Sequence, residues 1–303
     1  MFSGQGSQFF QMGRELFEHN EVFRDSAIRL DAQVREATGT QVLEAIYSRD
    51  KSQAFDQTAL THPAIFIVEI SLARALLHAG VVPDMTLGAS LGSFAAAAIA
   101  GFMDTDEALK CVLHQAAALE SCCERGGMLA ILGSPALFAE ACFAGSELAG
   151  TNFDSHFVVS APQPHLESIE VHLRARDIAH QRLAVSVAFH SRWIDAAQAS
   201  FESSMHSVRA RPGHLPLVCC ERAAPLRTLP DDFLWRCVRQ PIRFRDTITQ
   251  LERSGPFRYI DLGPSGTLAT FVKYARPSDS QSSAQAILTP FGRDLKNLSA
   301  VLN

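Results

Sequence analysis

PDMTLGASLG, residues 83–92, decides how the centre of this 303-residue chain folds. Its pentad Gly88-Ala89-Ser90-Leu91-Gly92 follows a short strand-like segment and precedes an alanine-rich stretch that ends at Gly101. Such a Gly-x-Ser-x-Gly pentad is typical of a nucleophile elbow, because the glycines let the backbone turn sharply and leave the serine side chain exposed. We therefore predict that Ser90 is a nucleophile at a strand-to-helix turn. The alternative is a tight turn in which the serine has no chemical role.

Helical and strand-like segments alternate on both sides of this turn. A helical pattern over 63–72, for example, comes before a short strand at 85–87. This alternation predicts an α/β fold in which a parallel sheet carries helices on both faces.

Between residues 127 and 187 the segments become shorter. We expect strands at 128–132, 157–160 and 180–187, and helices at 135–143 and 164–176. This order is similar to a βαββαβ, ferredoxin-like unit. We predict that residues 127–187 form a small lobe inserted into a large lobe made of residues 1–126 and 188–303, with a cleft between the two.

The composition excludes several classes of function. A formal net charge of −5 with no run of Lys or Arg argues against binding to nucleic acid. The first residues lack the features of a signal peptide, and the small-apolar run at 94–99 is too short to cross a bilayer, so we expect a soluble cytoplasmic protein with no membrane partner. The seven cysteines show no Cys-x-x-Cys spacing, and we expect reduced thiols, no disulfide and no metal site.

A serine hydroxyl needs a base before it can act as a nucleophile at neutral pH. Of the eleven histidines, His190 ends a strand-like segment where the small lobe returns to the large one, which places it at the cleft. An α/β-hydrolase would carry its histidine near the carboxyl end, after an acidic residue. No histidine follows His214, so the ordinary esterase arrangement is disfavoured and His190 is the predicted base.

Three further motifs accompany the pentad: FSGQGSQ at 2–8, VAFHS at 187–191 and DLGPSG at 261–266. Together, and in this order, they resemble the malonyl-CoA:acyl-carrier-protein transacylases and the acyltransferase domains of polyketide synthases. The resemblance covers essentially the whole chain. It implies a large α/β-hydrolase-like lobe with an inserted ferredoxin-like lobe, an acyl thioester substrate and an acyl carrier protein partner. It implies no cofactor beyond the phosphopantetheine that the substrate carries.

The resemblance also implies roles for single residues. Ser90 would carry the acyl group and His190 would be its base, while the backbone amides of Gln5 and Leu91 would form the oxyanion hole. A backbone carbonyl near Cys237 would orient the histidine. Side chains expected to line the acyl pocket are Ala89, Phe189, His62, Asn152 and Gln115.

The sequence departs from the family pattern at three of these pocket positions. Ala89 replaces the usual histidine and His62 replaces the usual glutamine. Gln115 stands where extender-unit transferases have an arginine that binds a substrate carboxylate.

The register of Gln115 can be checked on its own helix. Asp104 and Glu107 predict a capped start, and Cys111, Val112, Gln115, Ala116 and Leu119 then share one buried face. No Lys or Arg occurs from residue 111 to 124. Because a buried carboxylate without a partner costs several kcal/mol, we expect an uncharged acyl group at Gln115. The alternative is that Arg125 swings in to supply the charge.

These expectations lead to two enzymatic hypotheses. The first is an acyl hydrolase that removes short uncharged acyl groups from carrier-protein thioesters. With Gln115, the segments 267–273 and 288–291 are similar to those of the stand-alone, acyltransferase-like proofreading hydrolases of polyketide pathways whose synthases lack their own acyltransferase domains. The second is an acyltransferase that moves malonyl or another acyl unit from CoA or a carrier protein to a carrier protein. A decayed acyltransferase kept as a docking module is a third, non-enzymatic interpretation.

Overall fold

The large lobe is built on strands that come from distant parts of the chain. In the computed structural model, which describes residues 1–205, 208 and 210–303, β1 (Thr86–Gly88) pairs in parallel with β6 (Leu217–Cys219). β6 pairs in antiparallel fashion with β7 (Ala224–Leu226). A second pair, β8 (Arg258–Asp261) and β9 (Ser283–Ala286), is parallel.

The first two residues of the chain join these two groups of strands. The amide of Phe2 donates to the carbonyl of Leu87 at 2.8 Å, and the amide of Ala89 donates to the carbonyl of Phe2 at 3.0 Å. On the other side, the amide of Leu262 donates to the carbonyl of Met1 at 3.0 Å. Residues 1–2 therefore lie between β1 and β8 at the centre of the lobe. The prediction of a mainly parallel sheet is confirmed, with β7 as an antiparallel edge.

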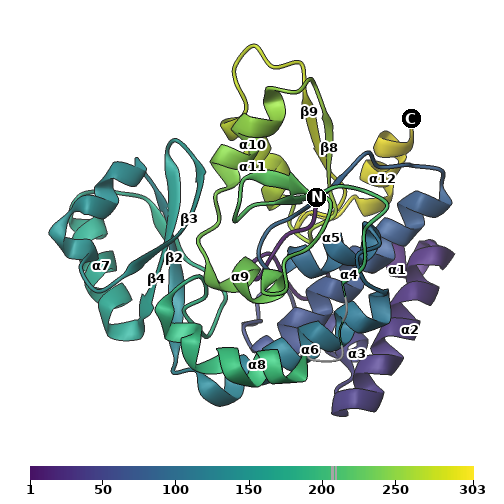
Figure 1. Cartoon of the computed structure of the whole chain (residues 1–303), viewed down its shortest axis with the longest axis horizontal. Coiled ribbons are helices and arrows are strands. Elements are labelled where there is room, and N and C mark those ends of the chain that lie inside the picture. The colour runs from purple at the N-terminus through teal and green to yellow at the C-terminus, as the bar shows by residue number, and fades with distance from the viewer. Residues whose placement is uncertain (206–207, 209) are drawn as a thin grey trace.

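Helices surround this sheet, as Figure 1 shows. In the large lobe they are α1 (Arg14–His19), α2 (Glu21–Thr38), α3 (Val42–Ser48), α4 (Thr58–His78), α5 (Gly92–Ile99), α6 (Thr105–Cys122), η3 (Arg192–Ala197), α8 (Gln198–Ser204), α9 (Phe233–Arg239), α10 (Phe244–Glu252), α11 (Thr267–Ala275) and α12 (Asp294–Leu302).

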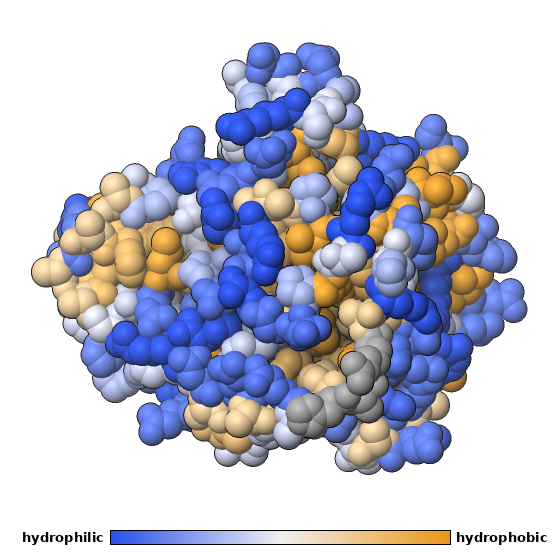
Figure 2. Space-filling view, in the orientation of Figure 1, coloured by the Kyte–Doolittle hydropathy of each residue, from blue (hydrophilic) through white to orange (hydrophobic). Residues whose placement is uncertain are grey.

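Helix α4 is the core helix of the lobe and contacts α2, α5 and α6. Within the described part of the chain it alone is long and apolar enough to cross a membrane, yet 83% of its most apolar window is buried inside the protein. A helix that is apolar on all sides is the expected centre of a large core. Correspondingly, the face shown in Figure 2 is mostly hydrophilic, with hydrophobic residues in scattered groups.

The small lobe is a four-stranded antiparallel sheet, at the left of Figure 1. Its elements are β2 (Gly126–Leu132), η1 (Pro135–Ala139), η2 (Ala141–Phe143), β3 (Glu147–Phe153), β4 (His156–Pro162), α7 (Gln163–Ala175) and β5 (His180–Arg182). The strand order β3-β4-β2-β5 is that of a ferredoxin-like unit.

Three details of the small lobe differ from the sequence prediction. The helix expected over 135–143 is two short 3₁₀ helices, because the backbone of Glu140 is extended and interrupts it. Strand β3 was not expected, and the last strand ends at Arg182 rather than at Val187.

Backbone hydrogen bonds join the two lobes. The amide of Ile242 donates to the carbonyl of Ala149 at 2.8 Å, and the amide of Thr151 donates to the carbonyl of Ile242 at 2.9 Å. The edge strand of the small lobe is therefore fixed to the segment that precedes α10.

The elbow between β1 and α5 depends on close backbone contact. A Cβ atom added at Gly92 would lie 2.2 Å from the carbonyl oxygen of Phe2, and one added at Gly88 would lie 2.4 Å from the Cα of Ser93. Neither partner is a side chain that could move aside. Both glycines are thus required for the start of α5 to pack against the central strands.

We expect Gly92→Ala to destabilise the protein by about 3 kcal/mol or more, because a methyl group there overlaps backbone that is itself part of the sheet. Urea denaturation followed by circular dichroism measures the change. Gly39→Ala is the matched control. Nothing lies within 4 Å of its added Cβ, so only the positive φ of residue 39 should destabilise this variant, by about 1 kcal/mol. Equal losses in the two variants would contradict the role given to Gly92.

Candidate active site

Ser90 lies at the turn between β1 and α5, as the pentad predicts. Its backbone is in the left-handed region, with φ at 54°, and the residue is 8% exposed. A non-glycine residue in this conformation is strained, and such strain is typical of functional turns. The turn directs the Ser90 side chain toward His190 and the cavity between the lobes.

The side chain of His190 contacts Ser90 directly. The Ser90 Oγ and the His190 Nε2 are 2.8 Å apart, and the His190 Nδ1 lies 2.7 Å from the carbonyl oxygen of Gln240. Because a carbonyl only accepts, Nδ1 carries the proton and Nε2 is left to accept from the serine hydroxyl. The structure thus brings together the two residues that sequence reasoning paired.

The carbonyl that orients His190 belongs to Gln240, so the prediction of Cys237 is wrong. Helix α9 extends to Arg239, which leaves the Cys237 carbonyl inside the helix, directed along its axis. Gln240 is the first residue with extended backbone after the helix. The carbonyl of Val238 meanwhile accepts from the His190 amide at 2.9 Å, so the end of α9 holds both the backbone and the ring of the histidine.

Burial controls the protonation of His190. It lowers the pKa of the imidazole to about 4, while the hydrogen bond to Gln240 raises it and the charge of Arg239 lowers it further. Desolvation acts in this direction because it disfavours the charged form. The ring is therefore neutral at neutral pH and able to accept a proton from Ser90.

The loop at residues 4–6 passes against the nucleophile. A Cβ added at Gly4 would lie 2.7 Å from the Cβ of Ser90. Buried Glu69 holds this loop, since its Oε1 accepts from the Ser3 amide at 2.6 Å and from the Ser3 hydroxyl at 3.0 Å.

Two backbone amides near Ser90 are available to a substrate. Within residues 1–205, 208 and 210–303, neither the Gln5 amide nor the Leu91 amide donates a hydrogen bond. The side chain of Gln5 is tied back, because its Nε2 donates to the Thr61 Oγ1 at 2.6 Å. Unpaired amides beside a nucleophile at the start of a helix suit the stabilisation of a developing oxyanion.

A cavity of about 370 Å³ between the two lobes opens onto Ser90. Of the residues predicted for the site, it is lined by Gln5, Ala89, Ser90, Asn152, Phe189 and His190. His62, Leu91, Gln115 and Cys237 do not line it. The cavity is closed on the small-lobe side by strands β2, β3 and β4, which supply mainly apolar atoms.

His156 lines the cavity and was missed by sequence reasoning. Its Nδ1 lies 3.0 Å from the Nδ2 of Asn152, and its ring lies 5.2 Å from that of Phe271. Burial lowers the pKa of His156. Sequence patterns gave no signal for His156, because the pairing of β3 with β4 is what brings this residue to the cavity.

His62 and Gln115 are both completely buried. No polar atom of either side chain has a hydrogen-bond partner among the residues that the structure describes. Burial lowers the pKa of His62 to about 3, so its ring is neutral at neutral pH. The amide of Gln115 carries no charge. A buried polar group left without a partner costs about 1–3 kcal/mol, so a partner such as water or a ligand group is expected at these atoms.

The register predicted for the helix that carries Gln115 is confirmed. Helix α6 begins after Asp104, whose amide donates to the Glu107 carboxylate at 3.0 Å, and the predicted apolar face is buried. Exposed Arg125 follows the helix.

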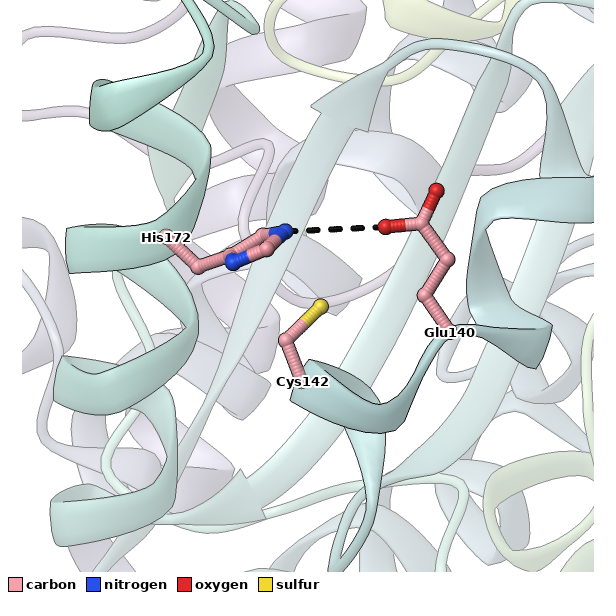
Figure 3. A group of neighbouring side chains, drawn as sticks. All are labelled: Glu140, Cys142 and His172. Carbon is pink, nitrogen blue, oxygen red and sulfur yellow. Dashed lines mark ion pairs between the residues drawn. The ribbon is translucent and has the colours of Figure 1, made fainter.

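A group of possible metal ligands lies on the small lobe. Glu140, Cys142 and His172 offer ligand atoms within 4.8 Å of one another (Figure 3). The guanidinium of Arg176 pairs with Glu140 and lies 3.2 Å from the Nε2 of His172. A positively charged side chain is thus already paired with two of these three residues, so we interpret the group as an ion-pair cluster. All seven cysteines are free thiols.

Comparison with known proteins agrees with this geometry. The family described as "Acyl transferase domain" matches residues 1–303. The polyketide biosynthesis acyltransferase homolog PksD of Bacillus subtilis (strain 168) is 43% identical over 305 residues, which cover 99% of this chain and 94% of PksD. The homolog BaeD of Bacillus velezensis is 41% identical, with the same coverage of 99% and 94%.

Solved structures share the same architecture. The loading acyltransferase of the avermectin polyketide synthase superposes with a TM-score of 0.91 over 99% of this chain and 97% of that one, and at 24% identity it shows the fold alone. The acyltransferase domain of the second salinomycin synthase module is 27% identical, with a TM-score of 0.86 over 99% of this chain and 70% of that one. From its first motif to its last, the chain belongs to the acyl transferase domain family.

Proposed function

We propose that the protein is an acyl hydrolase that removes short, uncharged acyl groups from acyl carrier protein thioesters in polyketide biosynthesis. The observation that carries the proposal is Gln115, a fully buried neutral side chain in a segment without Lys or Arg. The names of the relatives PksD and BaeD support the polyketide context.

In this proposal the acyl group is transferred to Ser90 first. The Ser90 Oγ attacks the thioester carbonyl carbon while the His190 Nε2 takes the hydroxyl proton. The amides of Gln5 and Leu91 stabilise the oxyanion of the tetrahedral intermediate. As the intermediate collapses, the carbon–sulfur bond breaks and His190 returns the proton to the departing thiol of the phosphopantetheine arm.

Water then removes the acyl group by the same route. His190 takes a proton from a water molecule, the resulting hydroxide adds to the ester carbon, and collapse releases a carboxylic acid and restores the Ser90 hydroxyl. In this proposal the phosphopantetheine arm lies in the cavity between the lobes, which opens onto Ser90.

The second candidate is an acyltransferase, which family membership favours. Its residues and its first step would be the same, because transfer and hydrolysis differ only in whether a thiol or water attacks the acyl-serine. The absent arginine argues against malonyl as the transferred group, since a carboxylate beside His62 and Gln115 would be buried without a counter-charge.

The deciding experiment incubates the protein with acetyl-loaded and malonyl-loaded carrier protein, with and without a second, unloaded carrier. We expect the acetyl group to disappear from the first carrier as free acetate and not to appear on the second, as measured by intact mass. Ser90→Ala should show no turnover. Efficient malonyl loading of Ser90 followed by passage to the second carrier would overturn the hydrolase proposal.

Gln115→Arg should raise the fraction of Ser90 that carries malonyl by about tenfold or more, because the guanidinium provides the missing counter-charge. Occupancy is read by intact mass after brief exposure to malonyl-CoA. Gln115→Lys is the control: a lysine has the charge but not the paired donors, and we expect a smaller gain. An unchanged occupancy in both variants would show that residue 115 does not face the acyl group.

The pH dependence should reflect the lowered pKa of His190. We expect kcat/KM for acyl-serine formation to fall on the acid side near pH 4, not near the ordinary histidine value of about 6.5. Protein stability should already fall between about pH 6.5 and pH 4, because over this range the unfolded chain protonates this histidine and the folded chain does not. Circular dichroism at each pH separates the two effects, and an acid limb near 6.5 in folded protein would contradict the assignment.

A further inference from the structure

Helices α4 and α6 run in opposite directions along one another. The amide of Ala59 in α4 donates to the Glu120 carboxylate in α6 at 2.7 Å. Toward the other end, the Arg74 guanidinium lies 3.3 Å from the Thr105 hydroxyl. Residue numbers therefore rise along α4 while they fall along α6. The two contacts set the approximate level of the residues that lie between them along the helix axes.

This register places the two unsatisfied side chains at nearly the same level along the two helices. Gln115 lies level with Ala64, two residues from His62, which is about 3 Å along the helix axis. Both side chains are completely buried, and none of their polar atoms is paired among residues 1–205, 208 and 210–303. We treat His62 and Gln115 together as one neutral polar site, which we call the amide–imidazole pair.

The hydrogen-bonding capacity of this pair defines its ligand. A neutral imidazole offers one donor and one acceptor, and an amide offers two donors and an acceptor. Such a set matches a hydroxyl group or a ketone oxygen. A carboxylate is disfavoured because neither side chain is charged, and an alkyl chain would leave the polar atoms without partners.

Phe189 separates the pair from the cavity at Ser90. Its ring lines the cavity and lies 5.6 Å from the ring of His62. Its backbone is fixed, since its amide donates to the Val187 carbonyl and its carbonyl accepts from the Ser160 hydroxyl. The ring is itself buried, and turning it would break neither hydrogen bond, so a rotamer change is the simplest movement that would open the cavity toward His62.

We propose that an acyl chain on Ser90 displaces the Phe189 ring and that the amide–imidazole pair then hydrogen-bonds an oxygen on C3 of that chain. The preferred substrates are accordingly 3-hydroxyacyl and 3-oxoacyl thioesters, rather than saturated chains of the same length. This inference rests on the acyl-serine chemistry of the proposed function, but it does not depend on whether water or a thiol completes the reaction.

The test compares four-carbon thioesters of one carrier protein: butanoyl, each enantiomer of 3-hydroxybutanoyl, and 3-oxobutanoyl. We expect at least one oxygenated substrate to acylate Ser90 with a kcat/KM about tenfold above that of butanoyl. In Gln115→Met, which has a similar length but no strong hydrogen-bonding group, this ratio should fall to about one. His62→Phe should lower it in the same direction.

Ser71→Ala is the matched control. The Ser71 hydroxyl is also buried and unpaired within the described residues, on the same helix but more than two turns from His62, so its loss should leave the ratio unchanged. Gln115→Met should also raise the melting temperature, because it removes two unsatisfied polar atoms, and this readout does not need activity.

Equal rates for butanoyl and all the oxygenated substrates in the wild-type protein would overturn the inference, and would mean that water satisfies the pair. A preference that persists in Gln115→Met would overturn it as well. Transfer of the oxygenated chain to a second carrier, with the preference intact, would instead overturn the hydrolase proposal and leave this inference standing.

Discussion

The pairing of residues 1–2 between β1 and β8 is the constraint on which the site depends. It places three strands side by side in parallel, and the carboxyl ends of parallel strands meet at one edge of a sheet. Three loops follow these strands: the one with Gln5, the elbow with Ser90 and the one with Ser265. Each of these residues lines the cavity between the lobes. Gly92 permits this arrangement because it leaves room for the carbonyl of Phe2.

The segment that returns from the small lobe brings His190 to this edge. His190 follows the return from that lobe, and the end of α9 then holds it through the carbonyls of Val238 and Gln240. The tautomer of His190 is set by the backbone carbonyl of Gln240, and no side-chain substitution removes that carbonyl directly. Burial lowers the pKa of His190 and of His62, and the Gln115 amide carries no charge, so all three of these side chains are neutral at neutral pH.

Sequence reasoning predicted the features that depend on local geometry. The turn at Ser90 was recognisable because a strand-to-helix turn needs glycines at fixed spacing, and the burial of Gln115 because helical periodicity and a capping box fix a register. Gln240 was missed by three positions although the sequence contains the signal for it: the residue before Pro241 is disfavoured in the helical region, so α9 ends at Arg239 and Gln240 is extended. Strand β3, with Gly150, Thr151 and Asn152, has weak strand propensity and is stabilised by pairing with β4. His156 belongs to the site only through that pairing.

The central place of residues 1–2 also sets the order in which the chain can fold. The amide that pairs with Met1 belongs to Leu262, so the sheet closes only after most of the polypeptide has left the ribosome. Contacts between residues so distant in sequence slow folding, because loop-closure entropy is paid before the contact forms. Helix α4 is synthesised early, and part of its apolar surface stays uncovered until α5 and α6 have been synthesised. Production of this protein should therefore be sensitive to chaperone capacity and to temperature during synthesis.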